Sequence, residues 1–148
     1  MGKLLLLLLF IFPCASRSQT RHLTTANGLP DNVAYQTLQD QQGFLWIATD
    51  QGVVRYDGQL MKVYAREQGV PDIEVMQLVM ETCGRIWLRC YDNSVAFYDP
   101  VRNRFVSVSA YIALAGLGHV KRLRALEEGG LQIDLERVKL IRRFQRTL

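Results

Sequence analysis

The carboxylates are the first side chains of this sequence that could do chemistry. Six aspartates fall at expected strand ends or turns: Asp31, Asp50, Asp57, Asp72, Asp92 and Asp99. General acid–base catalysis needs two carboxylates that converge on a pocket. Recurrence at equivalent chain positions favours a different role, in which each carboxylate accepts hydrogen bonds from nearby backbone. We therefore predict turn-forming aspartates and no catalytic residue, so the chain is expected not to be an enzyme.

The cysteines and histidines form no pattern typical of a metal or nucleophilic site. On one continuous strand Cys83 and Cys90 would lie about 23 Å apart, far beyond the roughly 7 Å that a disulfide allows between Cα atoms, so two isolated thiols are predicted. His22 and His119 are distant in sequence and are expected on the surface. No cofactor and no metal is predicted, and the ligand-binding residues are unknown at this stage.

The turn Asp40-Gln41-Gln42-Gly43 could be mistaken for a calcium loop. It lacks the ladder of acidic residues and the terminal glutamate that such a loop needs. We interpret it as a hairpin turn.

Charge is divided unevenly along the 148 residues, which carry a formal net charge of +4. Between Gln19 and Gly118 there are 8 basic and 10 acidic residues, whereas His119 to Leu148 contains 8 basic and 4 acidic residues. The basic residues of this tail are Lys121, Arg122, Arg124, Arg137, Lys139, Arg142, Arg143 and Arg146. A membrane-surface or nucleic-acid segment is one interpretation. A solvated face, or sequence outside the repeat, is the preferred one, and no nucleic-acid partner is predicted.

The N-terminal residues have the three-part layout of a secretory signal peptide. A positive start at Lys3 is followed by an apolar run from Leu4 to Phe12, then by Pro13 and small residues. Nine apolar residues rise only about 14 Å as a helix, about half of a bilayer core. We predict a signal peptide over residues 1–18, with cleavage after Ser16 as the other option. A retained membrane anchor and a lipoprotein centred on Cys14 stay open as alternatives.

Two segments of the chain repeat each other at an offset of 41 residues. Gly28-Leu29-Pro30 aligns with Gly69-Val70-Pro71, and Trp46 aligns with Trp87; one inserted residue then brings Tyr56-Asp57 onto Tyr98-Asp99. Apolar residues alternate with a period of two, which is typical of strands. The expected strands are 33–38, 44–49, 53–56 and 61–64, then 75–80, 86–90, 95–98 and 105–108.

Four-stranded sheets with two apolar faces must stack on copies of themselves, which predicts an all-β partial β-propeller. The tryptophans are expected to fill the gaps between blades, the alternative being an exposed aromatic platform. A third copy of the repeat is degenerate: if Gly129 corresponds to Gly43, Gln132 stands at the position of the tryptophan. Strands at 131–135 and 138–140 around a turn at 136–137 predict a degenerate blade, and a basic helix over 134–148 is the alternative. The outer faces of so short a stack are expected to stay apolar and to allow self-association.

The segment Asn27 to Gly58 resembles the two-component regulator propeller repeat. The matching motifs are the G-L-P turn, the D-x-x-G turn, the L-W-I-A-T strand and the ending G-hydrophobic-x-R-Y-D-G. The resemblance implies an extracytoplasmic sensor region that precedes a membrane helix and signalling modules. It supplies no ligand residues, because these contacts vary within the family.

These observations predict four segments: a signal peptide (1–18), a first blade (19–67), a second blade (68–109), and a degenerate third blade or basic tail (110–148). The expected function is an exported sensory module, periplasmic or on the outer face of the inner membrane, that binds an unknown extracellular ligand or partner protein. It would correspond to the N-terminal part of a two-component sensor truncated before its kinase, with membrane contact only through downstream regions. The alternative is a stand-alone secreted interaction protein that completes its propeller by oligomerisation.

Overall fold

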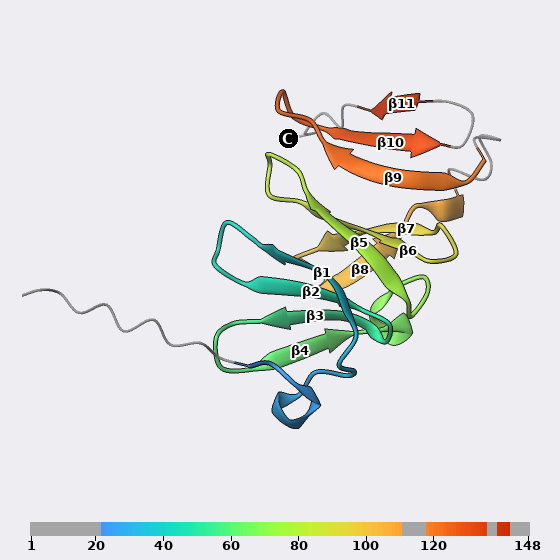
Figure 1. The fold of residues 1–148 in the computed structure, drawn as a ribbon. Coiled ribbons are helices and arrows are strands. Elements are labelled where there is room, and N and C mark those ends of the chain that lie inside the picture. The colour runs from blue at the N-terminus through green and yellow to red at the C-terminus, as the bar shows by residue number, and fades with distance from the viewer. Residues whose placement is uncertain (1–21, 111–117, 136–138, 143–148) are drawn as a thin grey trace, which may run out of the picture.

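The computed structural model describes residues 22–110, 118–135 and 139–142, and this part of the chain forms three antiparallel sheets (Figure 1). The first sheet contains β1 (Ala34–Gln39), β2 (Leu45–Thr49), β3 (Gly52–Tyr56) and β4 (Met61–Tyr64). The second contains β5 (Val75–Met80), β6 (Ile86–Cys90), β7 (Val95–Asp99) and β8 (Arg104–Ser107). The third contains β9 (Val120–Ala125), β10 (Leu131–Leu135) and β11 (Lys139–Arg142). Short 3₁₀ helices, η2 (Thr25–Asn27) and η3 (Arg66–Gln68), precede the first and second sheets.

The all-β, blade-like architecture predicted from the repeat is confirmed. Each of the eight strands expected in the first two sheets is present, with its ends within one residue of the expected ones. Within each of these sheets the strands follow chain order, each paired with the next. The strand at 131–135 is also confirmed, and a helix over 134–148 is wrong for residues 139–142, which form β11. The expected signal peptide and the turn at 136–137 lie outside the described residues.

One strand, β9, was not predicted because a β-bulge hides its alternation. Its buried residues, Val120 and Leu123, are three apart instead of two. The pairing register of β9 shifts between Val120 and Arg122. The first strands of the other two sheets shift register at the equivalent place, between Ala34 and Gln36 and between Val75 and Gln77. A bulge inserts an extra residue and reverses the alternation beyond it.

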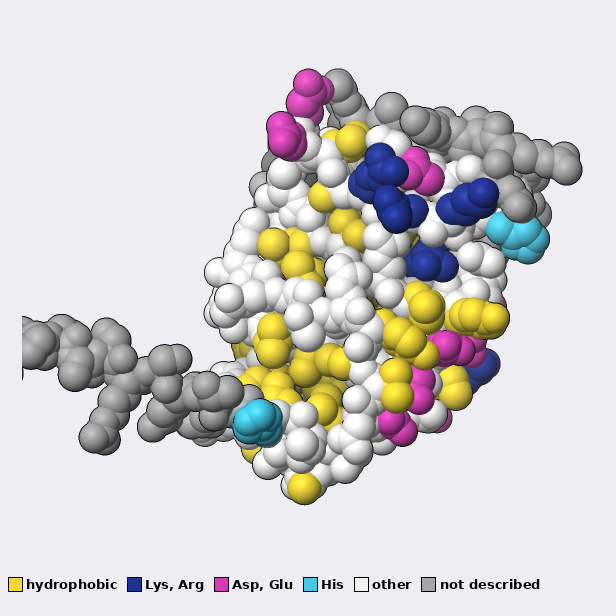
Figure 2. Space-filling view, viewed as in Figure 1, with side chains coloured by type: hydrophobic (Ala, Val, Ile, Leu, Met, Phe, Trp, Pro, Cys, Tyr) yellow, Lys and Arg dark blue, Asp and Glu magenta, His cyan; other side chains and the backbone are white. Residues whose placement is uncertain are grey.

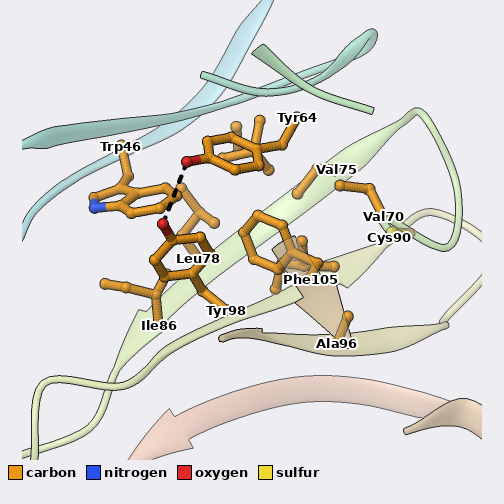
Figure 3. Packing of buried hydrophobic residues seen from close by; sticks show 13 residues of the cluster. Trp46, Tyr64, Val70, Val75, Leu78, Ile86, Cys90, Ala96, Tyr98 and Phe105 are labelled. Carbon is orange, nitrogen blue, oxygen red and sulfur yellow. Dashed lines mark hydrogen bonds between the residues drawn. The ribbon is translucent and has the colours of Figure 1, made fainter. Parts of the chain in front are cut away.

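The sheets stack face to face, and large aromatic side chains fill the space between the first two. Trp46 of β2 is 1% exposed and lies 4.8 Å, between ring centroids, from Tyr98 of β7. Tyr64 and Phe105 complete this cluster, and Figure 3 shows Trp46 and Tyr64 facing Tyr98 and Phe105 across the interface. Trp87 occupies the same position between the second and third sheets, also at 1% exposure. The prediction that the tryptophans fill the gaps between blades is confirmed.

Each tryptophan is held by a carboxylate from the turn that precedes its strand. The indole Nε1 of Trp46 donates to Asp40 Oδ2 at 2.7 Å, and that of Trp87 donates to Glu81 Oε1 at 2.7 Å. Asp40 also accepts the backbone N–H of Gln42 and Phe44. One acidic residue therefore shapes the turn and satisfies the buried indole N–H, which must find an acceptor.

A glutamine side chain ties each of the first two sheets to the sheet that follows. The Gln36 side chain accepts the Leu78 N–H and donates to the Leu78 carbonyl, both at 3.0 Å. Gln77 makes the same pair of bonds to Leu123, at 3.0 and 2.9 Å. We call each pair of bonds a glutamine clasp. Because β5 and β9 are edge strands of their sheets, the clasp satisfies backbone groups that no neighbouring strand reaches.

The connection between the first two sheets requires a glycine. Gly69 follows η3 with φ +87°, and a Cβ there would collide with the carbonyl oxygen of Phe105. Gly28 follows η2 in the same left-handed conformation, φ +105°. The G-L-P and G-V-P turns thus bring each linker against its sheet, where Leu29 and Val70 are buried.

The expectation that both outer faces stay apolar is wrong at the third sheet. The face of β9 and β10 turned away from the second sheet carries Arg122, Arg124, Gln132 and Asp134. In Figure 2, lysine and arginine side chains gather over this end of the molecule.

No helix among the described residues is long and apolar enough to cross a bilayer.

The glutamine clasp leads to a first prediction. Gln36→Ala leaves the Leu78 N–H and carbonyl without partners in a position where Leu78 is 1% exposed. We expect the free energy of unfolding, measured by urea denaturation, to fall by about 2 kcal/mol.

Gln39→Ala on the same strand is the matched control, because Gln39 is exposed and its side chain donates to the nearby Gly43 carbonyl. It should change stability by less than about 0.5 kcal/mol. Equal losses for the two variants would show that the clasp contributes nothing of its own.

Candidate functional site

A cleft of about 600 Å³ lies along the edge where the first and second sheets meet. Its walls are the turn Asp40–Gly43 of the first sheet and the turn Glu81–Gly84 of the second. We call it the seam cleft and define it by Phe44, Trp46, Arg55, Glu81, Cys83 and Tyr98, which line it. The Gln41 side chain donates to the Thr82 carbonyl and links the two turns.

Two arginines, Arg55 and Arg85, line the seam cleft, and aromatic rings hold the guanidinium of Arg55. The guanidinium carbon lies 4.6 Å from the centroid of Phe44 and 5.7 Å from that of Trp46. Nη1 donates to the Tyr98 hydroxyl at 3.0 Å. Arg55 is half-buried, so its charge is stabilised by ring faces as well as by water.

A hydroxyl network lies behind Arg55. Tyr98 and Tyr64 both donate to Asn103 Oδ1, at 2.9 and 2.7 Å, and their hydroxyls are 3.3 Å apart. Asn103 adopts φ +51°, a left-handed conformation that asparagine tolerates better than most residues. Burial, and then the hydrogen bond with Tyr98, raise the pKa of Tyr64 above its ordinary value. The Tyr64 phenol therefore stays neutral, and both hydroxyls serve as fixed hydrogen-bonding groups.

The two carboxylates of the seam cleft are already engaged by the fold. Asp40 is bonded by its turn and by Trp46, as described above. Glu81 is 2% exposed and accepts from the Trp87 indole and, at 3.0 Å, from the Cys83 thiol. These bonds give both groups the structural role of holding tryptophans.

A cation–π pair covers the tryptophan in both of the first two sheets, with the partners exchanged. In the first sheet the arginine is on β3 (Arg55) and the ring precedes β2 (Phe44). In the second sheet Arg85 precedes β6 and lies 5.3 Å from the ring of Phe97 on β7. The two sheets thus place an arginine and a ring near each tryptophan in opposite arrangements, and both arginines, Arg55 and Arg85, line the seam cleft.

The two described cysteines are free, as predicted, and differ in access. Cys83 is exposed in the turn that lines the seam cleft, whereas Cys90 is fully buried. Burial raises the pKa of the Cys90 thiol to about 11. Only Cys83 is placed to react with molecules that enter the cleft.

Most of the aspartates singled out from the sequence do form turns. Oδ1 accepts backbone N–H bonds in Asp31, Asp57, Asp72, Asp92 and Asp99. Asp50 is the exception, since its Oδ1 is buried without a hydrogen-bond partner. His22 and His119 are exposed, as expected. Within the ranges that the structure describes, no group of three or more His, Cys, Asp and Glu side chains could hold a metal ion.

Residues 28–51 match the family described as the two component regulator propeller. This match covers the turn after η2, β1, the Asp40 turn and β2, and it confirms the resemblance stated from the motifs. No curated protein matches the chain.

Three solved structures from B. thetaiotaomicron are similar to the chain. Two are of one extracellular domain, described in one case as belonging to a hybrid two component system and in the other to a one component system. They are 16% identical to this chain, cover 76% and 72% of it, and give TM-scores of 0.49 and 0.45. The third, from another hybrid system, is 16% identical, covers 78% of the chain and gives a TM-score of 0.37. The chain spans 23%, 22% and 24% of the lengths of those domains.

In the propeller repeat, the tryptophan, the turn acid and the ending R-Y-D-G could be found from the sequence. Their convergence into a cleft could not, because Arg55 and Tyr98 are 43 residues apart. The only available signal was that Tyr98 aligns with Tyr56 in the repeat, which places it at a strand end. The seam cleft offers an exposed thiol, guanidinium donors and ring edges, which suit binding of a polar ligand better than bond cleavage.

Thiol labelling tests the openness of the seam cleft. In the full chain at pH 8.5 we expect maleimide to modify Cys83 at least about a hundredfold faster than Cys90, because a packed core must open before it reacts. Mass spectrometry of labelled peptides separates the sites, and both should react in guanidinium chloride. Similar native rates for Cys83 and Cys90 would contradict the burial described above.

Proposed function

We propose that this chain is an exported sensory module that corresponds to the N-terminal part of a two-component sensor propeller. The single observation that carries the proposal is the family match at residues 28–51, located in the first of three stacked sheets. Its output module, a histidine kinase, would lie outside these 148 residues. The proposed location is the periplasm or the outer face of the inner membrane.

We place ligand detection at the seam cleft. Two sheets contribute to its walls, so a ligand there would contact both and would alter how the first sheet sits against the second. Arg55 supports this role because its guanidinium faces the cleft while also bonding Tyr98 of the second sheet. The hydroxyl network through Tyr98, Asn103 and Tyr64 would carry the change into the packed interface. A fixed network of this kind responds to a ligand by shifting between discrete packings.

Export can be tested with alkaline phosphatase, which is active only outside the cytoplasm. A fusion to the C-terminus of residues 1–148 should be active in cells. The same fusion lacking residues 1–18 should lose nearly all activity while being made in similar amount. Equal activity of the two fusions, or none from either, would contradict the proposed signal peptide.

Ligand detection can be tested by thermal shift of the full chain against a panel of small polar molecules. A ligand at about a hundredfold excess over Kd should raise the Tm by about 5 °C or more. Arg55→Ala should abolish that shift.

Lys62→Ala is the matched control, because Lys62 pairs with Arg55 across β3 and β4 and also lies over a ring, but does not line the seam cleft. It should keep the shift. A ligand whose effect survives Arg55→Ala would place detection elsewhere.

A further inference from the structure

Exposed apolar side chains gather at the end of the strands opposite the seam cleft. Tyr35 lies at the start of β1, Ile73 precedes β5 and Tyr91 follows β6. They are 40%, 37% and 66% exposed. We call these three residues and Glu74 the tyrosine patch. In Figure 2, hydrophobic and acidic side chains lie together at the right of the molecule, over the starts of β1 and β5.

Glu74 connects the two tyrosines of the patch. The Tyr35 hydroxyl donates to Glu74 Oε1 at 2.8 Å, and the Tyr91 backbone N–H donates to the Glu74 carbonyl at 2.8 Å. Tyr35 comes from the first sheet and the other residues from the second, so the patch bridges the junction of two described sheets. Because sheets stack through their faces and the patch lies at strand ends, further blades of a propeller would leave it open.

The repeat shows that the fold does not require these apolar residues. At the offset of 41 residues, Ile73 corresponds to Asn32 and Tyr91 corresponds to Asp50. The first sheet therefore forms the same linker and hairpin with polar residues at both positions. Single exposed apolar residues are common on protein surfaces, but several around one glutamate form a patch that a binding partner can cover.

The surroundings of the tyrosine patch are acidic. The hydrogen bond to Glu74, desolvation, and then the charges of Glu74, Asp50 and Asp31 raise the pKa of Tyr35. Among the described residues, no lysine or arginine forms an ion pair with any of these three carboxylates. Asp50 Oδ1 also has no hydrogen-bond partner. The negative charge at this edge is therefore not balanced by the described part of the chain.

The cation that the chain places near this edge is already paired. Arg66 forms an ion pair with Asp72, which precedes the patch in sequence. Elsewhere the chain covers aromatic rings with its own cations, as Arg55 does over Phe44 and Lys62 over Tyr64. In the described ranges no lysine or arginine lies over the ring of Tyr35 or Tyr91.

Exposed rings beside unpaired carboxylates have the chemistry that recognises organic cations. An ammonium or guanidinium group is attracted to the face of a tyrosine ring, and it forms strong hydrogen bonds with a carboxylate. Sites for small molecules are concave and enclose most of the ligand. The side chains of the tyrosine patch instead stand out from the strand ends, and tyrosine is enriched where proteins bind each other.

We propose that the tyrosine patch docks a lysine- or arginine-rich segment of a partner protein. Its cations would lie over Tyr35 and Tyr91 and would pair with Glu74 and the neighbouring aspartates. This goes beyond the proposed sensor function and does not use the seam cleft. Failure of ligand detection at Arg55 and failure of docking at the tyrosine patch are therefore separate results.

Fluorescence anisotropy of labelled decalysine, titrated with the full chain at low ionic strength, tests the proposal. The wild type should bind this peptide, and the same peptide acetylated on every lysine side chain should not bind. In the double variant Tyr91→Ala, Glu74→Gln the Kd should rise at least about fivefold, because one ring and one charge are lost. Glutamine at position 74 keeps an acceptor for the Tyr35 hydroxyl, and a native circular dichroism spectrum should confirm that the variant folds.

The matched control is Val101→Ala, Glu127→Gln, which removes one exposed apolar side chain and one exposed acid from turns at the other end of the strands. It has the same net charge as the patch variant and should change the Kd by less than about twofold. Equal losses in the two variants, or no binding by the wild type, would overturn the proposal.

Two other occupants are separate outcomes of the same experiments. Spermidine that binds as tightly as decalysine would overturn the assignment to a protein segment, because a small cation would then be enough. Light scattering tests the second occupant. Association of the wild-type chain that grows with concentration and disappears in the patch variant would also overturn the proposal, and would identify a second copy as the partner.

Discussion

The structure depends on how the edge strands of its sheets are satisfied. The first strand of each sheet has a neighbour on one side only, so a row of backbone N–H and carbonyl groups would otherwise meet water or a foreign strand. The chain provides a side-chain amide instead. Gln36 and Gln77 reach across to Leu78 and Leu123 and act as short pieces of an added strand. The β-bulge places these glutamines, since it lies at the same position in all three first strands.

Packing between neighbouring sheets goes together with the glutamine clasps that join them. Trp46 and Trp87 fill the two interfaces, and each donates its indole N–H to the acidic residue of the turn before its own strand. The same turns line the seam cleft, so the residues that build the fold also shape the surface where a ligand would bind. This double use of the turns explains why Asp40 and Glu81, the two carboxylates that line the cleft, have structural roles. It also explains why Arg55, an ordinary member of the R-Y-D-G ending, lines the cleft together with Arg85.

Much of the fold could be predicted because its signals are local. The 41-residue offset, the period of two and the glycine turns identified eight strands, and the tryptophan position predicted which side chains fill the interfaces. β9 was missed because its bulge spaces Val120 and Leu123 by three. The clasps and the seam cleft could not be predicted, since both join residues more than 40 positions apart. The polar side chains on the outer face of β9 and β10 could be recognised only after the register paired Arg122 with Asp134.

Hydrogen exchange at two backbone amides, those of Leu78 and Leu123, tests the central claim most directly. Both lie on edge strands, so without the glutamine side chains they would exchange as quickly as other unpaired amides. We expect NMR to show them protected to the level of the amides in the strand ladders, with the amide of Leu78 becoming rapid in Gln36→Ala while that of Leu123 stays slow. Rapid exchange of both amides in the wild-type chain would contradict the account, because the sheets would then not be joined as described.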